Sequence, residues 1–578
     1  MYLRNLIMAV LISIIMPAKL VGQSKPNFIL IMTDDQGYGD FGITGNDLIE
    51  TPAINKFAHE SVRFERFYVS PVCAPTRASL LTGRYYLRTG VTGVTRREET
   101  MNTEEVTIAE LLGANGYATG CFGKWHNGAN FPFDPIGQGF DEFWGFTGGI
   151  IRNYFDTRVR HNQEMVEMEG YLTDFFTDKA IEFIETNQQQ PFFAYIPYNV
   201  PHTPIQVPDP LFEKYLAKGL DEYTAGIYAM CETVDHNLEK LLNRLESLGI
   251  AQNTVVIFLT DNGPNGTRFN GGMKGKKGGV DEGGVRVPLW IRWKNTLPSN
   301  RIVTALAGHI DILPTIMDLA GLKTPDTLQL DGRSLKPLLE IDQYAWPERN
   351  LFSFYNGKGA IRNNSHRLTV SRDDKVALYD MLADPAQLTD LSGKLPDKKN
   401  ALYQKYQTWL AEVNKESTVP PIHLGHPEQP VVMLPTAGGN LSGALKYKNK
   451  NGYAFDWATN WVSAEDEFSW EVQVVNDGIY EIYAQHLLPP GSEGAQVLLE
   501  ISDQKVRQTI KSPYIPDPYP NPDQVDRGRL PEMKWKDFHW GNVKLRKGNY
   551  QVRLRATKIP GESAGELYGL KVVYRTNN

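Results

Sequence analysis

Cysteine is scarce in this sequence, with Cys73, Cys121 and Cys231 as the only three among 578 residues. A set this small and odd in number excludes a disulfide scaffold and a zinc site built from cysteines. Blocks of five or six like charges are also missing, and 60 basic against 67 acidic residues leave a net charge of −7. The sequence therefore gives no sign of a nucleic-acid partner.

The N-terminal apolar run, residues 6–16, is too short to span a bilayer. Arg4 precedes the run and the small or polar residues 22–24 follow it, which is typical of a secretory signal peptide. We predict a signal peptide over 1–23 and a secreted or periplasmic protein without a stable membrane anchor. An anchoring helix at the same place is the alternative.

Two nearly continuous hydrophobic runs, 27–33 and 254–260, have the pattern of strands that are covered on both faces of a sheet. Between them, apolar residues recur at three- and four-residue spacing from 227 to 248, which predicts an amphipathic helix. Alternation of such strands and helices indicates an α/β domain with a mostly parallel sheet flanked by helices. We predict this domain over 24–340.

After residue 340 the sequence pattern differs from that of the α/β domain. A strand-like stretch at 375–379 and a helical one at 400–414 predict a small α+β subdomain over 341–424. Proline and histidine then accumulate, which predicts a linker over 425–435. Short alternating strands broken by glycine and proline follow, and predict an all-β sandwich over 436–578.

The two hydrophobic strands end alike, in Asp34-Asp35 and in Asp261-Asn262. Ligands of parallel sheets gather beyond the carboxyl ends of the strands. Three carboxylates and an amide that meet there would repel one another unless a cation lay among them. Ligands that are all oxygen select Ca²⁺ or Mg²⁺ over zinc. The alternative is that each aspartate only caps a turn.

Cys73 begins a segment that has the signals of a short helix. Pro75 suits the first helical turn and Gly83 suits the helix end. The free N–H groups of a helix N-terminus attract anions, and Arg77 would add a forked, permanently charged donor. A buried free cysteine is the alternative, but the spacing of the proline and the arginine argues against it.

The pattern Cys-x-Pro-x-Arg followed by Ser-Leu-Leu-Thr-Gly-Arg, residues 73–84, resembles the signature of type I sulfatases. These enzymes belong to the alkaline phosphatase superfamily, and their cysteine is oxidised after translation to formylglycine. The resemblance covers about residues 25–415 and includes the stretches 123–126 (GKWH), 201–204 (PHTP) and 277–288. It implies an alkaline-phosphatase-like fold. It also implies a catalytic set of Cys73, Arg77, Lys124, His126, His202 and Lys277, and metal ligands Asp34, Asp35, Cys73, Asp261 and Asn262.

The same resemblance implies a mechanism. The formylglycine hydrate attacks sulfur with one hydroxyl, and its second hydroxyl later loses a proton toward His126 so that sulfate leaves. Arg77, Lys124 and Lys277 hold the sulfate, and Lys274 and Lys276 are alternatives for the last of these. His202 protonates the leaving alcohol.

We therefore predict an exported sulfatase that uses Ca²⁺, with Mg²⁺ as an alternative, and acts on a sulfated polysaccharide or its oligosaccharides. Its partners are the sulfated carbohydrate and a formylglycine-generating or sulfatase-maturating enzyme. A phosphonate or phosphate ester hydrolase of the same superfamily and a non-catalytic glycan-binding protein are the alternatives. We expect substrate specificity in loops 148–171 and 353–372. The sandwich either binds glycan or braces the catalytic domain, and its tryptophans are either stacking surface or core: Trp457, Trp461, Trp470, Trp535 and Trp540.

Overall fold

The computed structural model describes residues 25–414, 419–449, 451–526, 528 and 530–575. The signal peptide predicted over 1–23 lies outside these residues. Within the described part of the chain, the helices are too short or too polar to cross a membrane.

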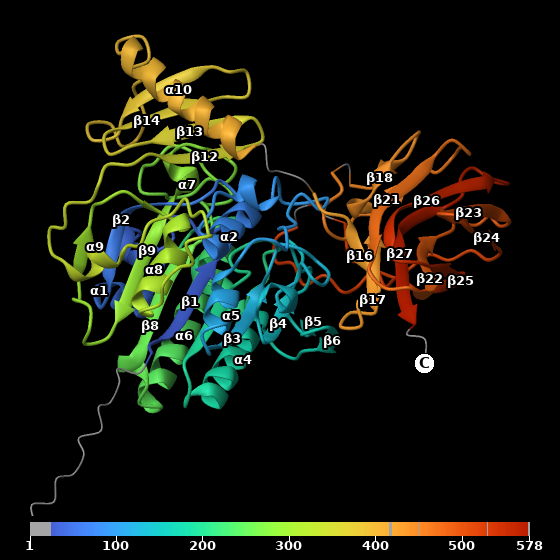
Figure 1. The fold of residues 1–578 in the computed structure, drawn as a ribbon, viewed down its shortest axis with the longest axis horizontal. Helices are drawn as coiled ribbons and strands as arrows, with labels where there is room; N and C mark the ends of the chain where they lie inside the picture. The colour runs from blue at the N-terminus through green and yellow to red at the C-terminus, as the bar shows by residue number, and fades with distance from the viewer. Residues whose placement is uncertain (1–24, 415–418, 450, 527, 529, 576–578) are drawn as a thin grey trace, which may run out of the picture.

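An eleven-stranded mixed sheet forms the centre of the N-terminal part (Figure 1). Its central strand β1 (Asn27–Thr33) is parallel to β8 (Thr254–Thr260) on one side and to β7 (Phe192–Pro197) on the other. Both predicted hydrophobic strands are confirmed with the expected bounds, and all their residues are buried. The full order is β10 (Arg301–Val303), β2 (Val62–Tyr68), β9 (Arg286–Trp293), β8, β1, β7, β3 (Ala118–Lys124), β4 (Glu142–Phe146), β5 (Arg158–His161) and β6 (Glu164–Glu167), with β11 (Ala307–Gly308) beside β2.

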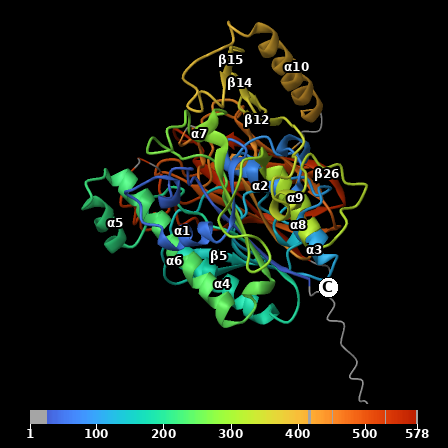
Figure 2. The same ribbon diagram turned by 90° about the vertical axis from the view of Figure 1, so that its left-hand side faces the viewer.

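Helices cover both faces of this sheet, which explains why β1 and β8 carry no polar face. Phe28, Leu30 and Met32 of β1 belong to one core cluster, and Ile29 and Ile31 belong to the opposite one. Figure 2 shows the two helical layers. The first layer contains α2 (Cys73–Thr82), α3 (Ile108–Gly113), α8 (Ile312–Leu319) and α9 (Lys336–Glu340), and the second contains α1 (Pro52–His59), α4 (Leu172–Asn187), α5 (Asp209–Leu216) and α6 (Glu222–Ser247).

A four-stranded antiparallel sheet lies above the central sheet in Figure 1 and carries one long helix, α10 (Pro396–Val413). Its strands are β12 (Leu351–Tyr355), β13 (Lys358–Arg362), β14 (His366–Val370) and β15 (Val376–Asp380). Leu402, Tyr406 and Trp409 of α10 share a core cluster with the central sheet. The strand and helix expected here from the sequence are both present.

Two six-stranded sheets form the C-terminal sandwich around a third core cluster. One contains β16 (Ile422–Leu424), β21 (Glu467–Val474), β26 (Gly548–Lys558), β23 (Ala495–Ile501), β24 (Gln504–Ile510) and β18 (Asn440–Leu441). The other contains β19 (Lys446–Tyr447), β20 (Ala458–Thr459), β27 (Glu566–Arg575), β22 (Gly478–Leu487), β25 (Phe538–Leu545) and β17 (Val431–Pro435). The expected fold class, an α/β part with a small α+β part and an all-β sandwich, is confirmed.

Two strands belong to the sandwich although the sequence predicts them in the α+β subdomain and in the linker. Strand β16, expected in the α+β subdomain, pairs with β21, and β17, expected in the linker, pairs with β27. Val432 and Leu434 of β17 are buried in the sandwich core, so alternation of side chains outweighs the nearby prolines. Four of the five sandwich tryptophans are buried, and Trp535 is half-buried, so these rings serve mainly as core.

Candidate active site

Four of the five predicted metal ligands meet at the carboxyl ends of β1 and β8. Asp34, Asp35, Asp261 and Asn262 are all fully buried. The Asp35 backbone N–H donates to Asp261 Oδ1 at 3.1 Å, and Asn262 Nδ2 donates to Asp35 Oδ1 at 2.9 Å. Asp35 lies in the left-handed region, with φ of 67°, a conformation that concentrates at functional sites.

This oxygen cluster fits a hard cation. Asp34 Oδ1, Asp35 Oδ2 and Asn262 Oδ1 are buried and find no hydrogen-bond partner among the described residues. Burial raises the pKa of Asp261, and the neighbouring Asp34 carboxylate raises it further. Buried oxygens without partners are costly, and a calcium or magnesium ion would satisfy them.

Cys73 is the first residue of α2 and faces the same cluster. One side-chain ligand atom from each of Cys73, Asp34 and Asp261 lies within 4.8 Å of the other two. The helix continues to Thr82 and ends at Gly83, whose φ of 69° is the left-handed conformation that glycine adopts at helix ends. The helix expected from the positions of Pro75 and Gly83 is therefore present.

Three cations surround the three carboxylates. Arg77 Nη2 lies 2.9 Å from Asp261 Oδ2, and Lys124 Nζ lies 2.5 Å from Asp34 Oδ2. The third pair joins Lys277 to Asp35. Each carboxylate thus has a cationic partner, which offsets the cost of burying these charged groups.

Lys277 is the lysine of its loop that reaches the cluster. Its Nζ lies 2.5 Å from Asp35 Oδ1, whereas Lys274 Nζ donates to the Tyr379 hydroxyl at 2.9 Å and Lys276 is exposed. Burial alone would favour the neutral amine, but Asp35 holds the pKa of Lys277 above its ordinary value. A charged lysine at this position suits contact with an anion.

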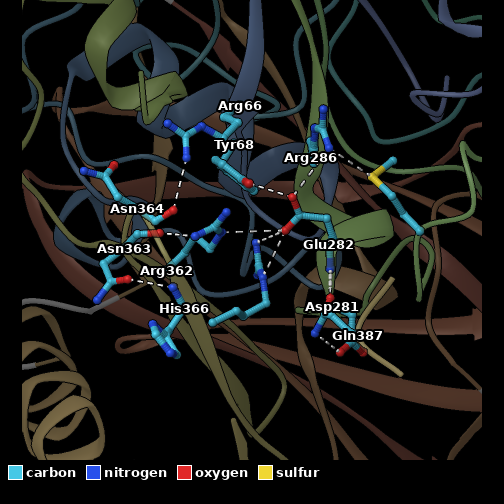
Figure 3. A network of polar contacts seen from close by, with 12 residues as sticks. Arg66, Tyr68, Asp281, Glu282, Arg286, Arg362, Asn363, Asn364, His366 and Gln387 are labelled. Carbon is cyan, nitrogen blue, oxygen red and sulfur yellow. Dashed lines mark hydrogen bonds and ion pairs between the residues drawn. The ribbon is translucent and has the colours of Figure 1, made fainter. Parts of the chain in front are cut away.

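A buried polar network anchors the loop that carries Lys277 (Figure 3). Glu282, the first residue of α7 (Glu282–Val285), accepts a hydrogen bond from the Tyr68 hydroxyl at 2.6 Å and one from Arg367 Nη2 at 2.9 Å. Its backbone N–H donates to Gln387 Oε1 at 2.7 Å. The network joins the central sheet to the four-stranded sheet and fixes the loop between them. Local sequence patterns gave no sign of it.

His126 is held as a neutral base. Its Nε2 lies 2.9 Å from the Val94 carbonyl, and because a carbonyl only accepts, Nε2 carries the proton. The buried Nδ1 has no partner among the residues that the structure describes. Burial, reinforced by the charge of Lys124, lowers the pKa of His126 to about 3. Nδ1 therefore offers a free lone pair at neutral pH.

His202 has the opposite tautomer. Nδ1 donates to the Thr203 carbonyl at 2.7 Å, and Nε2 lies 3.7 Å from Asp35 Oδ2. Burial lowers the pKa of His202 to about 3, although the Asp34 and Asp35 carboxylates favour the charged ring. The imidazole can act as an acid only when further negative charge nearby favours a proton on Nε2.

A cavity of about 920 Å³ opens over the cluster and is lined by Cys73, His126, His202 and Lys277. Residues 145–153 and 156–160 form part of its wall and overlap one of the two loops expected to carry specificity. Tyr355, from the other expected loop, and Tyr453, from the sandwich, also line it. A sandwich packed against the catalytic domain was one of the two expectations, but the residues that it contributes to the cavity were not predicted, because no periodic pattern marks a contact between distant parts of a chain.

Comparison with known protein families and with individual relatives identifies sulfatases in both cases. The sulfatase family model matches residues 26–322, and the model of the N-sulphoglucosamine sulphohydrolase C-terminal region matches residues 276–416. N-acetylgalactosamine-6-sulfatase of Canis lupus familiaris is 33% identical over 370 residues, which cover 57% of this chain and 69% of that protein. Uncharacterized sulfatase YdeN of Escherichia coli (strain K12) is 31% identical over 395 residues, covering 58% and 70%.

Among solved structures, Ps i-CgsB in complex with k-i-k-neocarrahexaose superposes with a TM-score of 0.64 at 28% identity, over 68% of this chain and 94% of that one. This likeness agrees with the alkaline-phosphatase-like architecture expected for the α/β part. The sulfatase family model alone covers more than half of the chain. The chain therefore belongs to the sulfatase family and is a sulfuric ester hydrolase.

Proposed function

We propose that this sulfatase is an exported, calcium-dependent enzyme that removes sulfate from a sulfated polysaccharide or its oligosaccharides, with Cys73 converted to formylglycine. The observation that carries the proposal is a cavity of about 920 Å³ that is lined by Cys73, His126, His202 and Lys277. A cavity of this size suits a ligand of several rings better than a small ester. The names of the relatives, an N-acetylgalactosamine-6-sulfatase and a protein crystallised with a neocarrahexaose, support a sugar substrate.

The sulfate group would bind between the carboxylate cluster and the cavity. Arg77, Lys124 and Lys277 supply three positive charges, and the N-terminus of α2 adds backbone N–H donors. Each cation pairs with a carboxylate, so the cations are held in position before the substrate arrives. Such preorganised charge stabilises the negative oxygens of a transferring sulfuryl group.

Calcium would supply positive charge that lowers the pKa of a nearby hydroxyl, and formylglycine would supply a hydrated aldehyde with two hydroxyls on one carbon. Asp34, Asp35, Asp261 and Asn262 fit the ion through their buried oxygens. The free Nδ1 lone pair of His126 would accept a proton from a hydroxyl at position 73.

His202 would give a proton to the leaving alcohol through Nε2. A bound sulfate ester adds negative charge near the imidazole, which opposes the effect of burial and favours the protonated ring. The Thr203 carbonyl keeps the Nδ1 proton in place, so only Nε2 exchanges a proton with the substrate. Lys277 is a second candidate donor because it lines the same cavity.

Export and maturation of the enzyme are inferred from the sequence. The predicted signal peptide supports export, and a formylglycine-generating or sulfatase-maturating enzyme would act on residues 73–77. With the strands placed as observed, we divide the mature chain into a catalytic part over 24–340, an α+β part that ends near 414, and a sandwich that begins at β16.

A comparison of turnover on different classes of substrate tests the proposal. Protein produced together with a formylglycine-generating enzyme is assayed on nitrophenyl sulfate, on a phenyl phosphonate ester, and on oligosaccharides of carrageenan, chondroitin sulfate and heparan sulfate. We expect hydrolysis of nitrophenyl sulfate and of at least one oligosaccharide, with the phosphonate far slower. A preference for the phosphonate would favour the phosphonate hydrolase alternative. Glycan binding without any hydrolysis would favour a non-catalytic protein.

A further inference from the structure

Besides residues of β16, β17 and β27, the sandwich contributes two loop segments to the catalytic cavity, 451–457 and 519–526. Tyr453, Phe455 and Tyr519 from these segments line the same cavity as Cys73. A bracing role alone does not require aromatic side chains in the lining of the cavity. The contacts that hold the two segments therefore decide whether this wall has a fixed position.

Segment 451–457 docks on a loop that also contacts a catalytic residue. Thr95 Oγ1 donates to the Gly452 carbonyl at 2.9 Å, and the adjacent Val94 carbonyl accepts from His126 Nε2 at 2.9 Å. The next two residues of this loop, Arg96 and Arg97, have φ angles of 58° and 68°, a strained conformation that must be held by its surroundings. Loop and sandwich are thus bonded to each other directly beside His126.

Segment 519–526 docks on the chain that follows His202. The Gln524 backbone N–H donates to the Ile205 carbonyl at 3.0 Å, and the Val207 N–H donates to Gln524 Oε1 at 3.0 Å. Gln206 Nε2 donates to the carboxylate of the preceding sandwich residue, Asp523, at 2.6 Å. The sandwich is therefore positioned from two directions, once beside each catalytic histidine.

Within segment 451–457, Tyr453 is displayed on a rigid turn. Asp456, only 3% exposed, accepts hydrogen bonds from the backbone N–H groups of Asn449, Gly452 and Trp457 at 3.0, 3.1 and 2.9 Å. Tyr453, in contrast, is 50% exposed. A large aromatic ring left exposed on an ordered turn is a common feature of ligand contacts.

Tyr355, at the end of β12, connects this turn to the sulfate end of the cavity. A Cβ placed on Gly278 would lie 4.0 Å from Tyr355 Cε1, and Gly278 directly follows Lys277. Burial raises the pKa of Tyr355, and its charged form would be further disfavoured by the nearby Cys73 and Tyr453. Lys277, Tyr355 and Tyr453 therefore follow one another along the cavity wall.

We propose that Tyr453 of the sandwich and Tyr355 of the α+β part hold the sugar rings of the substrate, so that the sandwich is a specificity element of the active site. The flat face of tyrosine packs on the C–H face of a sugar, and its hydroxyl bonds to a sugar hydroxyl. This inference rests on the proposed glycan substrate. The two tyrosine rings make the enzyme selective for oligosaccharides over small sulfate esters.

Kinetics of Tyr453→Ala test the inference, with Ile515→Ala as a matched control because Ile515 is 61% exposed on the sandwich and lies outside the cavity lining. We expect kcat/KM on the preferred oligosaccharide to fall roughly tenfold in Tyr453→Ala, and to fall at least fivefold more than on nitrophenyl sulfate. Ile515→Ala should match the parent enzyme on both substrates. Equal losses on the two substrates, or no loss on the oligosaccharide, would overturn the inference.

A binding measurement separates this inference from the proposed chemistry. In the Cys73→Ala background, which cannot form formylglycine, calorimetry with the same oligosaccharide should show roughly tenfold weaker binding after Tyr453→Ala. Asp456→Ala, which releases the turn but keeps the ring, should weaken binding in the same direction. Unchanged affinity in both variants would exclude a role for the sandwich even if sulfatase activity is established. If the parent enzyme hydrolyses no oligosaccharide, the glycan substrate of the proposed function is wrong and the inference falls with it. If the parent enzyme hydrolyses an oligosaccharide that Tyr453→Ala binds and hydrolyses equally well, the inference alone is wrong.

Discussion

Arg77 and Asp261 form a fully buried ion pair, with Nη2 2.9 Å from Oδ2. The same guanidinium donates through Nη1 to the Lys124 carbonyl at 2.8 Å. One arginine thus ties α2, which begins at Cys73, to the ends of β8 and β3. Because a buried charge is stable only with a partner, changes to the acidic cluster will also disturb the cations that we propose bind sulfate.

Removal of the metal should abolish activity. A chelator should inactivate the enzyme, and Ca²⁺ should restore turnover better than Zn²⁺, because the ligands are oxygens. Asp34→Ala and Asp261→Ala should bind no calcium when metal content is measured by atomic emission. Asp326→Ala, at an exposed carboxylate, is the control. Full turnover by protein shown to be free of metal would mean that the cluster is not a metal site.

His202→Ala should slow substrates with poor leaving groups most. A sugar alkoxide needs a proton as the S–O bond breaks, whereas nitrophenolate leaves without one. A general acid is typically worth about 10²- to 10⁴-fold, so the sugar sulfate should lose about that factor and nitrophenyl sulfate much less. The comparison of kcat on the two substrates measures this difference. Equal losses would remove His202 from the acid role.

Glu282→Gln should destabilise the enzyme at neutral pH. Burial opposes the ionised carboxylate, but Arg367 and Arg362 outweigh it and hold the pKa of Glu282 below its ordinary value of 4.5. A group with a lowered folded pKa stabilises the fold above its unfolded pKa, and this contribution is lost as pH falls through the folded value. Breaking such a buried pair costs about 3 to 5 kcal/mol.

The melting temperature of Glu282→Gln should therefore lie well below that of the parent enzyme at pH 7, and the two values should converge as pH falls below about 4.5. Glu169→Gln, at an exposed residue, should follow the parent enzyme throughout. A difference in melting temperature that stays constant from pH 7 to pH 3 would mean that Glu282 acts through packing and not through charge.

Deletion of residues 427–578 should lower the melting temperature and reduce turnover of every substrate. The deletion removes Gln524 from its bonds beside His202, and Val525 from its contact with the core of the central sheet. It also leaves β16 without its partner β21. An unchanged melting temperature together with unchanged nitrophenyl sulfate turnover would contradict the bracing role of the sandwich.

Features with a local pattern could be predicted from the sequence. Strands β1 and β8 have the expected bounds because they are buried on both faces and contain almost only apolar residues. Helix α2 has the expected ends because Pro75 and Gly83 act within one or two turns. The residues of the acidic cluster follow directly from the ends of these strands.

Features that depend on contacts between distant segments could not be predicted. Glu282 and Arg367 are 85 positions apart, and nothing near either residue indicates that they meet. The sandwich wall arises because Gly452 meets Thr95, which is 357 positions away. Strand β17 was missed for a related reason, since its pairing with β27 overrides the local signal of the surrounding prolines.

The chemical state of residue 73 is the most direct test of the proposed mechanism. Mass spectrometry of the tryptic peptide 67–77 from active enzyme should show an aldehyde at position 73 that resists thiol alkylation. The aldehyde content of different preparations should rise in proportion to their specific activity on nitrophenyl sulfate. Fully active enzyme that contains only alkylatable cysteine at position 73 would contradict the formylglycine mechanism.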